Sequence, residues 1–222
     1  MPAIHIQQVD ASCTSLTIAN IYCVGLNYSE HIHEMKSQRP DEPVIFLKPT
    51  SALRSQPETL NYPSHLTQDM HHEVEIVVAL GSGGYQIPLD KATDLIAAYG
   101  IGLDLTLRDR QSKAKQQGKP WAVAKGFKDS APVSAFVSAD QIADPQNLSF
   151  ELHINQSLRQ QGHSSQMLFS IAEIIAYLST VFELQAGDLI FTGTPAGVAA
   201  LLPGDQIQAN LENKIKLDFK VQ

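Results

Sequence analysis

Short apolar runs, several with a polar residue at every second position, recur along the 222-residue chain and predict β-strands. A period of two places successive side chains on opposite faces of a sheet, so each run can offer one face to a core. Turns that contain Gly or Pro, such as 81–84 and 203–205, separate the runs and are typical of antiparallel connections. The expected strands are 21–26, 44–47, 74–80, 101–107, 148–154, 189–192, 207–211 and 215–219.

Helical patterns are fewer. Asn27 with Glu30, and Ser170 with Glu173, have the spacing of a capping box, and the second pair precedes an apolar run that ends near residue 182. A further helix is expected at 90–99, closed by a glycine. Because strands outnumber helices and do not alternate with them regularly, the pattern predicts an α+β, mainly β fold and disfavours a doubly wound sheet.

Composition narrows the class of protein. The chain is 43% hydrophobic, long enough to bury roughly 70% of its unfolded surface, and undivided by repeats or linkers. We therefore expect one domain over 1–222, with its core at about 18–219. The net charge of -7 argues against nucleic acid as a partner, and Cys13 and Cys23 are too few for a disulfide framework. Without a leader pattern or an apolar stretch of ~20 residues, we expect no membrane association and a cytoplasmic location.

Two glutamates share one face of the expected strand at 74–80. The period of two puts Glu73 and Glu75 together and turns Val74 and Ile76 to the other side. Their Cα atoms would be about 7 Å apart, and carboxylates so placed repel each other unless a cation lies between them. A solvated outer face is the alternative, and this strand alone does not decide between the two.

A third carboxylate interrupts the apolar run that follows. Asp104 alternates with leucines, although Asp is a poor strand former. A carboxylate buried among apolar residues needs a compensating partner. Either Arg108 or a metal ion could supply it. Ligation by oxygen alone would favour Mg²⁺, Mn²⁺ or Ca²⁺ over zinc, and no HExxH spacing is present.

Other polar pairs offer candidate chemistry, each with an ordinary alternative. His31 and Glu34 are three apart on an expected helix, where the carboxylate could orient the imidazole as a general base, or the pair could be a surface ion pair. Lys48 and Lys125 each follow an apolar run and could bring a cation to a cleft, or they could be surface lysines with buried stems. Arg108 with Gln111 could hold a carboxylate.

The segment 192–197, Thr-Gly-Thr-Pro-Ala-Gly, follows an expected strand and could present hydroxyl and backbone N–H groups to an anion. It matches neither the Walker A pattern nor GxGxxG, so it says little about nucleotides.

Seven of these segments occur in the order found in a known family. They are Cys-Val-Gly-Leu-Asn-Tyr at 23–28, Phe-Leu-Lys-Pro at 46–49, His-Glu-Val-Glu at 72–75, Asp-Leu-Thr-Leu-Arg-Asp-Arg-Gln at 104–111, Gly-Lys-Pro-Trp at 118–121, Ala-Lys-Gly-Phe at 124–127 and Thr-Gly-Thr-Pro-Ala-Gly-Val at 192–198. From about residue 21 to 211 the sequence resembles the fumarylacetoacetate hydrolase family.

That resemblance implies a mixed β-sandwich or β-roll with short peripheral helices, assembled as a homodimer. It also implies Mg²⁺, or alternatively Mn²⁺ or Ca²⁺, on Glu73, Glu75 and Asp104, and a helix carrying His31 and Glu34 that closes over substrate as a lid. Within the family the chain is most similar to the small acylpyruvases that also act on oxaloacetate. Leu26, where many relatives carry Arg or Lys, and Gln166, near which others carry Asp, are departures.

The resemblance implies a small 2-oxo acid as substrate and Mg²⁺-dependent hydrolysis of a C–C bond in 3-acylpyruvates, through a pyruvate enolate held by the metal. His31 and Glu34 would activate water, and Lys125 would stabilise the oxyanion. The remaining candidates would hold the substrate: Lys48, Arg108, Gln111 and Thr192.

Three other functions stay open at this stage. Decarboxylation or tautomerisation of oxaloacetate needs the same enolate without an attacking water, and hydration of a 2-hydroxydienoate is a further enzymatic option. The alternative from another class is a metal-stabilised binding module without turnover, because a fold alone does not guarantee activity.

Overall fold

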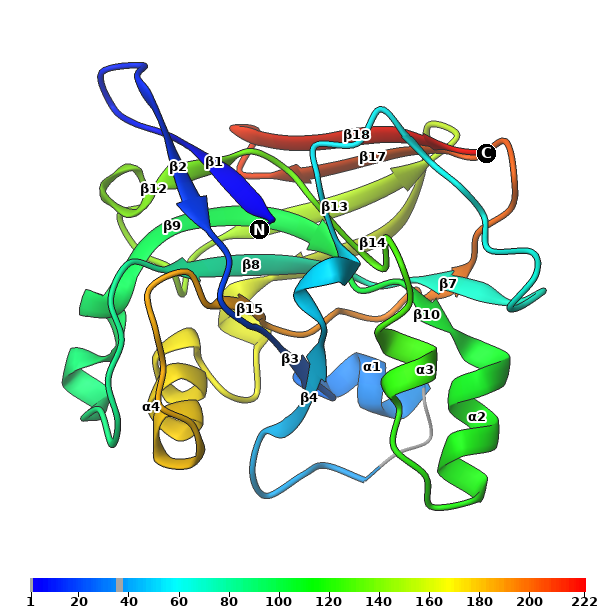
Figure 1. The fold of residues 1–222 in the computed structure, drawn as a ribbon, viewed down its shortest axis with the longest axis horizontal. Helices are drawn as coiled ribbons and strands as arrows, with labels where there is room; N and C mark the ends of the chain where they lie inside the picture. The colour runs from blue at the N-terminus through cyan, green and yellow to red at the C-terminus, as the bar shows by residue number, and fades with distance from the viewer. Residues whose placement is uncertain (1, 35–37) are drawn as a thin grey trace.

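The computed structural model describes residues 2–34 and 38–222. Its largest sheet has the strand order β2-β1-β12-β9-β8-β15-β3-β4, with β11 and β5 attached beside β9. Figure 1 shows this sheet strongly curled. Its strands are β1 (Ala3–Gln7), β2 (Cys13–Thr17), β3 (Ile21–Gly25), β4 (Val44–Lys48), β5 (Leu53–Ser55), β8 (Val74–Leu80), β9 (Ile96–Leu103), β11 (Ala131–Val133), β12 (Phe136–Ser138) and β15 (Leu189–Phe191).

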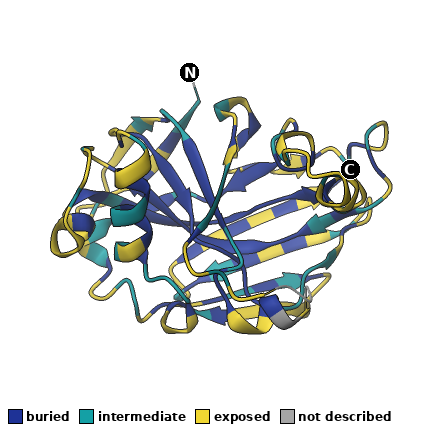
Figure 2. Ribbon diagram, turned by 90° about the horizontal axis from the view of Figure 1, so that it is seen from below, coloured by how far each residue is buried: buried dark blue, intermediate teal, exposed yellow. Residues whose placement is uncertain are grey.

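A second sheet, in the order β14-β13-β17-β18-β6, packs against the first. Its strands alternate buried and exposed residues, which Figure 2 shows as stripes, so one face is in the core and the other in solvent. These strands are β6 (Thr59–Leu60), β13 (Ser149–Ile154), β14 (Ser157–His163), β17 (Gln206–Leu211) and β18 (Ile215–Val221). A small sheet joins β7 (Met70–His72), β10 (Thr106–Leu107) and β16 (Ala199–Ala200).

The centre of the main sheet is buried on both faces. Every residue of β8 is buried. Val74, Ile76 and Val78 belong to the larger hydrophobic cluster, which includes residues of the second sheet and of α4, whereas Val77 and Ala79 belong to a separate cluster. The alternation predicted for this strand is therefore correct, and both of its faces meet a core.

Helices lie on the outside of the strands (Figure 1). They are α1 (Ser29–Glu34), α2 (Arg108–Gln116), α3 (Ala122–Lys125) and α4 (Ile171–Val181), with short 3-10 helices at Thr50–Ala52, Leu89–Leu95, Ala139–Gln141 and Ser164–Gln166. The capping box predicted at Ser170 and Glu173 is present in both directions and begins α4. The α+β, mainly β class is confirmed.

Two predicted elements are wrong in detail. The helix expected at 90–99 is a 3-10 helix that ends at Leu95, after which Ile96 begins β9, because pairing with β8 outweighs the local helical pattern. The strand expected at 101–107 breaks after Leu103 and resumes as β10 at Thr106, so Asp104 lies in the gap between two strands.

Candidate active site

The beginning of β8 and the end of β9 bring three carboxylates together. Val74 pairs with Leu103 across the two strands, and the Asp104 N–H donates to the Glu73 carbonyl oxygen at 2.8 Å. Glu75 follows within β8. One oxygen from each of Glu73, Glu75 and Asp104 lies within 4.8 Å of the other two. The acidic residues predicted from the sequence therefore form one cluster.

This cluster is out of solvent and holds buried lysines. Glu73 is 5% exposed and Glu75 and Asp104 are 1% exposed, which excludes the solvated outer face. Lys125 Nζ lies 2.7 Å from Glu73 Oε2 and 2.5 Å from Asp104 Oδ2, and Lys48 Nζ lies 2.8 Å from Asp104 Oδ1. Both lysines are 2% exposed, so neither is a surface lysine.

The two glutamates differ in their electrostatic surroundings. Burial raises the pKa of Glu73, but the charges of Lys125 and Arg108 lower it more, so its net pKa is below the ordinary value. The pKa of Glu75 is well above its ordinary value, because burial raises it and the neighbouring acids Asp104 and Glu73 raise it further. Glu75 is therefore the acid of the cluster whose charge is least compensated.

A glycine supplies the hydrogen bond that Glu75 does receive. The Gly193 N–H donates to Glu75 Oε2 at 2.7 Å. Gly193 has a φ of +102°, and a Cβ there would lie 2.6 Å from the Cβ of Asn27, so only glycine fits. Asn27 does not cap α1 as predicted. It is buried, and its side-chain amide bonds to the main chain of Thr192 and Phe169.

The donor set fits a hard divalent cation. All three acids offer carboxylate oxygens, the ligands that Mg²⁺ and Mn²⁺ prefer. Asp104 Oδ1 is buried and, although close to Lys48, accepts no well-aligned hydrogen bond from any residue that the structure describes. A cation among these oxygens would compensate Asp104 and Glu75 together.

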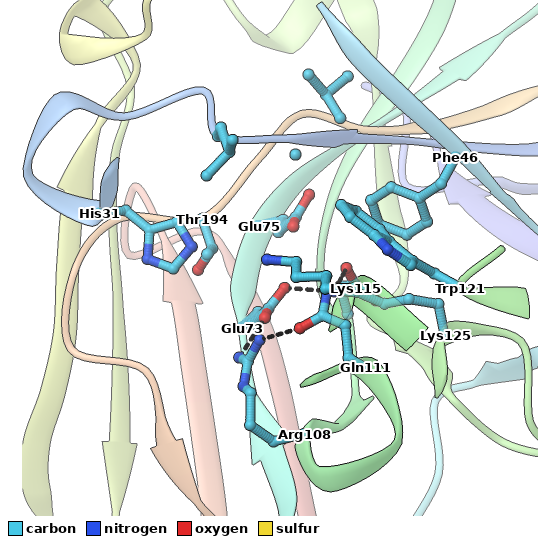
Figure 3. A pocket seen from close by; sticks show the side chains of 14 residues that line it. His31, Phe46, Glu73, Glu75, Arg108, Gln111, Lys115, Trp121, Lys125 and Thr194 are labelled. Carbon is cyan, nitrogen blue, oxygen red and sulfur yellow. Dashed lines mark hydrogen bonds and ion pairs between the residues drawn. The ribbon is translucent and has the colours of Figure 1, made fainter. Parts of the chain in front are cut away.

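His31 and Glu34 are also brought together. His31 Nδ1 lies 3.1 Å from Glu34 Oε2, and the imidazole is 6% exposed and lines the pocket that contains the acids. Glu34 Oε1 accepts a hydrogen bond from the Gly197 N–H at 3.1 Å, which ties α1 to the segment before β16. Figure 3 shows His31 across the pocket from Trp121.

Arg108 and Gln111 line the pocket from α2. Arg108 Nη1 donates to Gln111 Oε1 at 2.6 Å, and Nη2 lies 2.6 Å from Glu73 Oε1 (Figure 3). The two side chains contact each other, and the guanidinium is directed at an acid of the cluster.

Thr192 is placed differently from the expectation. It is completely buried, and its hydroxyl donates to the Ile76 carbonyl oxygen at 2.9 Å, outside the pocket lining. Thr194 lines the pocket in its place. Its hydroxyl accepts a hydrogen bond of 2.8 Å from Gln160, whose side-chain oxygen in turn accepts from the Val74 N–H at 3.0 Å.

Three further side chains line the pocket without having been assigned a role from the sequence. Phe46 and Trp121 belong to two of the seven matched segments, whereas Lys115 belongs to none, and its ammonium lies 5.1 Å from the centroid of a Trp121 ring. Of the two departures from the family pattern, Leu26 lines the pocket, whereas Gln166 lines a neighbouring hollow beside Tyr28.

The pocket lining, with Lys48 and Glu34 directly behind it, thus has two parts. We call the buried charged residues from the strand ends and α3 the deep half: Lys48, Glu73, Glu75, Asp104 and Lys125. We call the polar residues from α1, α2 and the 192–197 segment the open half: His31, Glu34, Arg108, Gln111, Lys115 and Thr194.

No helix within 2–34 and 38–222 is long and apolar enough to cross a membrane. Comparison with known proteins gives close relatives over most of the chain. It is 44% identical over 203 residues, 91% of each chain, to the mitochondrial oxaloacetate tautomerase FAHD1 of Bos taurus. It is 43% identical over 196 residues, 88% of this chain and 89% of the relative, to the oxaloacetate tautomerase YcgM of Escherichia coli (strain K12).

A solved structure shares the fold of this chain. The fumarylpyruvate hydrolase from Pseudomonas aeruginosa, in complex with Mn²⁺ and pyruvate, superposes with a TM-score of 0.92 at 35% identity and covers 100% of this chain and 97% of that one. The family model for the fumarylacetoacetate (FAA) hydrolase C-terminal region matches residues 20–222. The chain is therefore an enzyme of the fumarylacetoacetate hydrolase family.

Proposed function

We propose that the protein interconverts the enol and keto forms of oxaloacetate with the help of a divalent cation, Mg²⁺ or Mn²⁺. The observation that carries this proposal is the convergence of three buried carboxylates beside Lys125, one of which, Glu75, has no cationic partner among the described residues. Relatives that share over 40% of their residues with this chain are named for that activity. It was the second choice on sequence grounds, where acylpyruvate hydrolysis ranked first.

Glu73, Glu75 and Asp104 would hold the cation, which supplies a Lewis acid for the 2-oxo and carboxylate oxygens of the substrate. A cation there would also neutralise Glu73, the acid to which Arg108 is now bound. Arg108 would then be released to bind the C1 carboxylate together with Gln111, its neighbour on α2.

Lys125 would stabilise the charge that develops on the substrate oxygen. Burial lowers the pKa of Lys125, but Asp104 and Glu73 raise it more, so the net pKa is raised and the side chain keeps its proton. A protonated, buried amine is a hydrogen-bond donor in position for an enolate oxygen and is unsuited to act as a base.

The proton for carbon must come from the other side of the pocket. In tautomerisation the enol O–H loses a proton and C3 gains one, while the C2–C3 double bond becomes a C2–O double bond. His31, oriented by Glu34, lies in the open half, where it or a water molecule beside it can deliver the proton. Loss of CO₂ from keto-oxaloacetate instead breaks the C3–C4 bond and leaves the enolate of pyruvate, which carries its charge on the same C2 oxygen and then takes up a proton at C3.

A second candidate is hydrolysis of a 3-acylpyruvate, and the His31–Glu34 contact favours it. That pair could deprotonate water for attack on the distal carbonyl. The C–C bond then breaks to give a carboxylic acid and a pyruvate enolate, which takes up a proton. The similar fumarylpyruvate hydrolase holds Mn²⁺ and pyruvate, a pairing consistent with this chemistry.

The test is a substrate panel on the purified protein with Mg²⁺, with Mn²⁺ and with chelator. We expect faster ketonisation of enol-oxaloacetate with either metal than with chelator, and a lower kcat/KM for acetylpyruvate hydrolysis. If oxaloacetate is unaffected and acetylpyruvate is cleaved, the ranking of the two functions is reversed. If neither substrate turns over, the binding module without catalysis is favoured.

A further inference from the structure

Lys115 projects into the pocket from α2 and has no part in the functions assigned so far (Figure 3). It is seven residues after Arg108 and four after Gln111, so the three lie on one face of the helix. All three line the pocket. The helix therefore presents two adjacent cationic positions, one directed at the acidic cluster and one further from it.

The cations of this pocket differ in how they are compensated. Lys48, Lys125 and Arg108 each lie within 2.8 Å of a carboxylate oxygen of Glu73 or Asp104. Lys115 makes no ion pair with a carboxylate among the described residues, and its ammonium lies over Trp121. Its positive charge is thus left for something outside the protein.

The surroundings of Lys115 favour an anion. The residue is exposed at the open side of the pocket. Its pKa is lowered, first because the ammonium group is partly buried in the pocket and then by the like charge of Arg108, and the negative charge of an anionic ligand would offset both effects. The three buried acids equal in number the three cations Lys48, Lys125 and Arg108, although all three cations pair with Glu73 or Asp104. A bound divalent cation would therefore give the pocket a net positive charge, to which Lys115 would add.

We propose that Lys115 binds the distal carboxylate of a four-carbon 2-oxo diacid and makes the pocket prefer dianions over 2-oxo acids with an uncharged distal end. The proposal rests on the proposed function for the head of the substrate, which the deep half would hold together with Arg108 and Gln111. The distal end then faces the open half, where Lys115 lies over Trp121 and makes no ion pair with a carboxylate among the described residues.

The first experiment compares enol-oxaloacetate with its 4-methyl ester, which differs by the distal charge alone, in the metal-loaded wild-type enzyme and in Lys115→Met. One charge-assisted hydrogen bond predicts a fall in kcat/KM of about 10- to 100-fold for the diacid and less than about 3-fold for the ester. Lys115→Arg should recover part of the loss. Lys113→Met, an exposed lysine on the same helix that does not line the pocket, is the matched control and should leave both substrates unchanged.

An equal loss for diacid and ester, or no loss for either, overturns the proposal. A binding measurement separates this failure from failure of the proposed function. By calorimetry with Mg²⁺, the wild-type protein should bind malate more tightly than 2-hydroxybutyrate, and Lys115→Met should remove that difference. If malate binding depends on Lys115 but oxaloacetate is not tautomerised, the proposed function is wrong and the diacid site stands. If the wild-type protein does not prefer malate, the diacid site is wrong.

Discussion

The deep and open halves of the pocket are built in different ways. In the deep half, Glu73, Glu75 and Asp104 are at most 5% exposed and stand on or beside the central strands β8 and β9. The open half comes from the short helix α1, from α2 and from the segment before β16, and it includes the exposed residues Glu34 and Lys115. One half is fixed by strand register and the other by a few contacts between peripheral segments.

This difference suggests a division of labour. The head of any 2-oxo acid is the same, so the rigid deep half, with Arg108 and Gln111 beside it, can hold it for tautomerisation, decarboxylation or hydrolysis alike. What distinguishes these reactions is the distal group and the source of the proton or water, and both lie on the side of the open half. We therefore expect changes in the deep half to remove every activity and changes at His31 or Lys115 to alter the balance between activities.

The largest effect is expected from Glu75→Gln. Glu75 makes no ion pair among the described residues, so the amide should be accommodated without leaving a lysine unpaired. The loss of a negative ligand should weaken Mn²⁺ binding at least 100-fold and lower both tautomerisation and hydrolysis about 1,000-fold. Calorimetry with Mn²⁺ and the two assays measure this, with the exposed Glu30→Gln as control. Unchanged Mn²⁺ affinity would contradict the assignment of the metal site.

His31→Ala should show the difference between the two halves most clearly, because it should lower hydrolysis much more than ketonisation. Hydrolysis needs an activated water, so its kcat should fall about 100- to 10,000-fold. Ketonisation should fall about 10-fold or less, because solvent can protonate an enolate that the deep half still stabilises. The kcat values of one preparation on acetylpyruvate and on enol-oxaloacetate give the ratio directly. Equal losses would show that His31 serves the chemistry common to both reactions.

The deep half was largely predictable from the sequence. The period of two set Glu73 and Glu75 on one face, and a lone Asp among leucines marked Asp104. The contact between Glu73 and Asp104, 31 positions apart, could not be derived from periodicity, because it depends on the register that pairs Val74 with Leu103. The seven ordered segments and the resemblance they carry supplied that link.

The open half was less predictable for a physical reason. Leu107 provides no side-chain cap for α2, so no capping signal marks the point where the strand pattern stops and a helix begins at Arg108. The placement of Lys115 depends on that helix. The segment 192–197 was expected to present hydroxyl groups, but the choice of Thr194 over Thr192 could not be predicted. The orientation of Thr194 depends on Gln160, a buried glutamine on β14 that strand patterning does not single out.

Gln160 connects the backbone beside the deep half to Thr194 in the open half. Its replacement should therefore lower the stability of the fold and weaken substrate binding, both by a moderate amount. Its side-chain oxygen accepts from the Val74 N–H and its amide donates to Thr194 Oγ1 and to the Pro195 carbonyl oxygen. Gln160→Met keeps the volume but leaves these buried groups unpaired, which costs about 1–3 kcal/mol in the free energy of unfolding. Denaturant unfolding measures that cost, and KM for oxaloacetate should rise by about 3- to 10-fold. A stability loss with unchanged KM would show that Gln160 does not position Thr194.

The smallest effect concerns pH and the metal-free protein. The pKa of Glu75 is raised on folding, so the folded state holds the proton more tightly than the unfolded chain does. Its stability contribution is present below the unfolded pKa of about 4.3 and is lost as pH rises through the folded pKa. With chelator, the Tm of the wild-type protein should therefore fall more between pH 5 and 8 than that of Glu75→Gln, and added Mg²⁺ should remove the difference. If the Tm of the wild-type protein and that of Glu75→Gln change equally with pH in the presence of chelator, the charge of Glu75 is not uncompensated in the metal-free protein.

The most direct test of the account is the stereochemistry of proton delivery to C3. Enol-oxaloacetate is ketonised by the enzyme in D₂O and trapped at once by reduction to malate, whose C3 deuterium is located by NMR. If the deep half fixes the head of the substrate on a divalent cation and the proton arrives from the open half, one C3 epimer should dominate with Mg²⁺. Both epimers should appear equally with chelator or with Glu75→Gln. Equal epimers at the full metal-dependent rate, or one epimer regardless of chelator, would contradict the account.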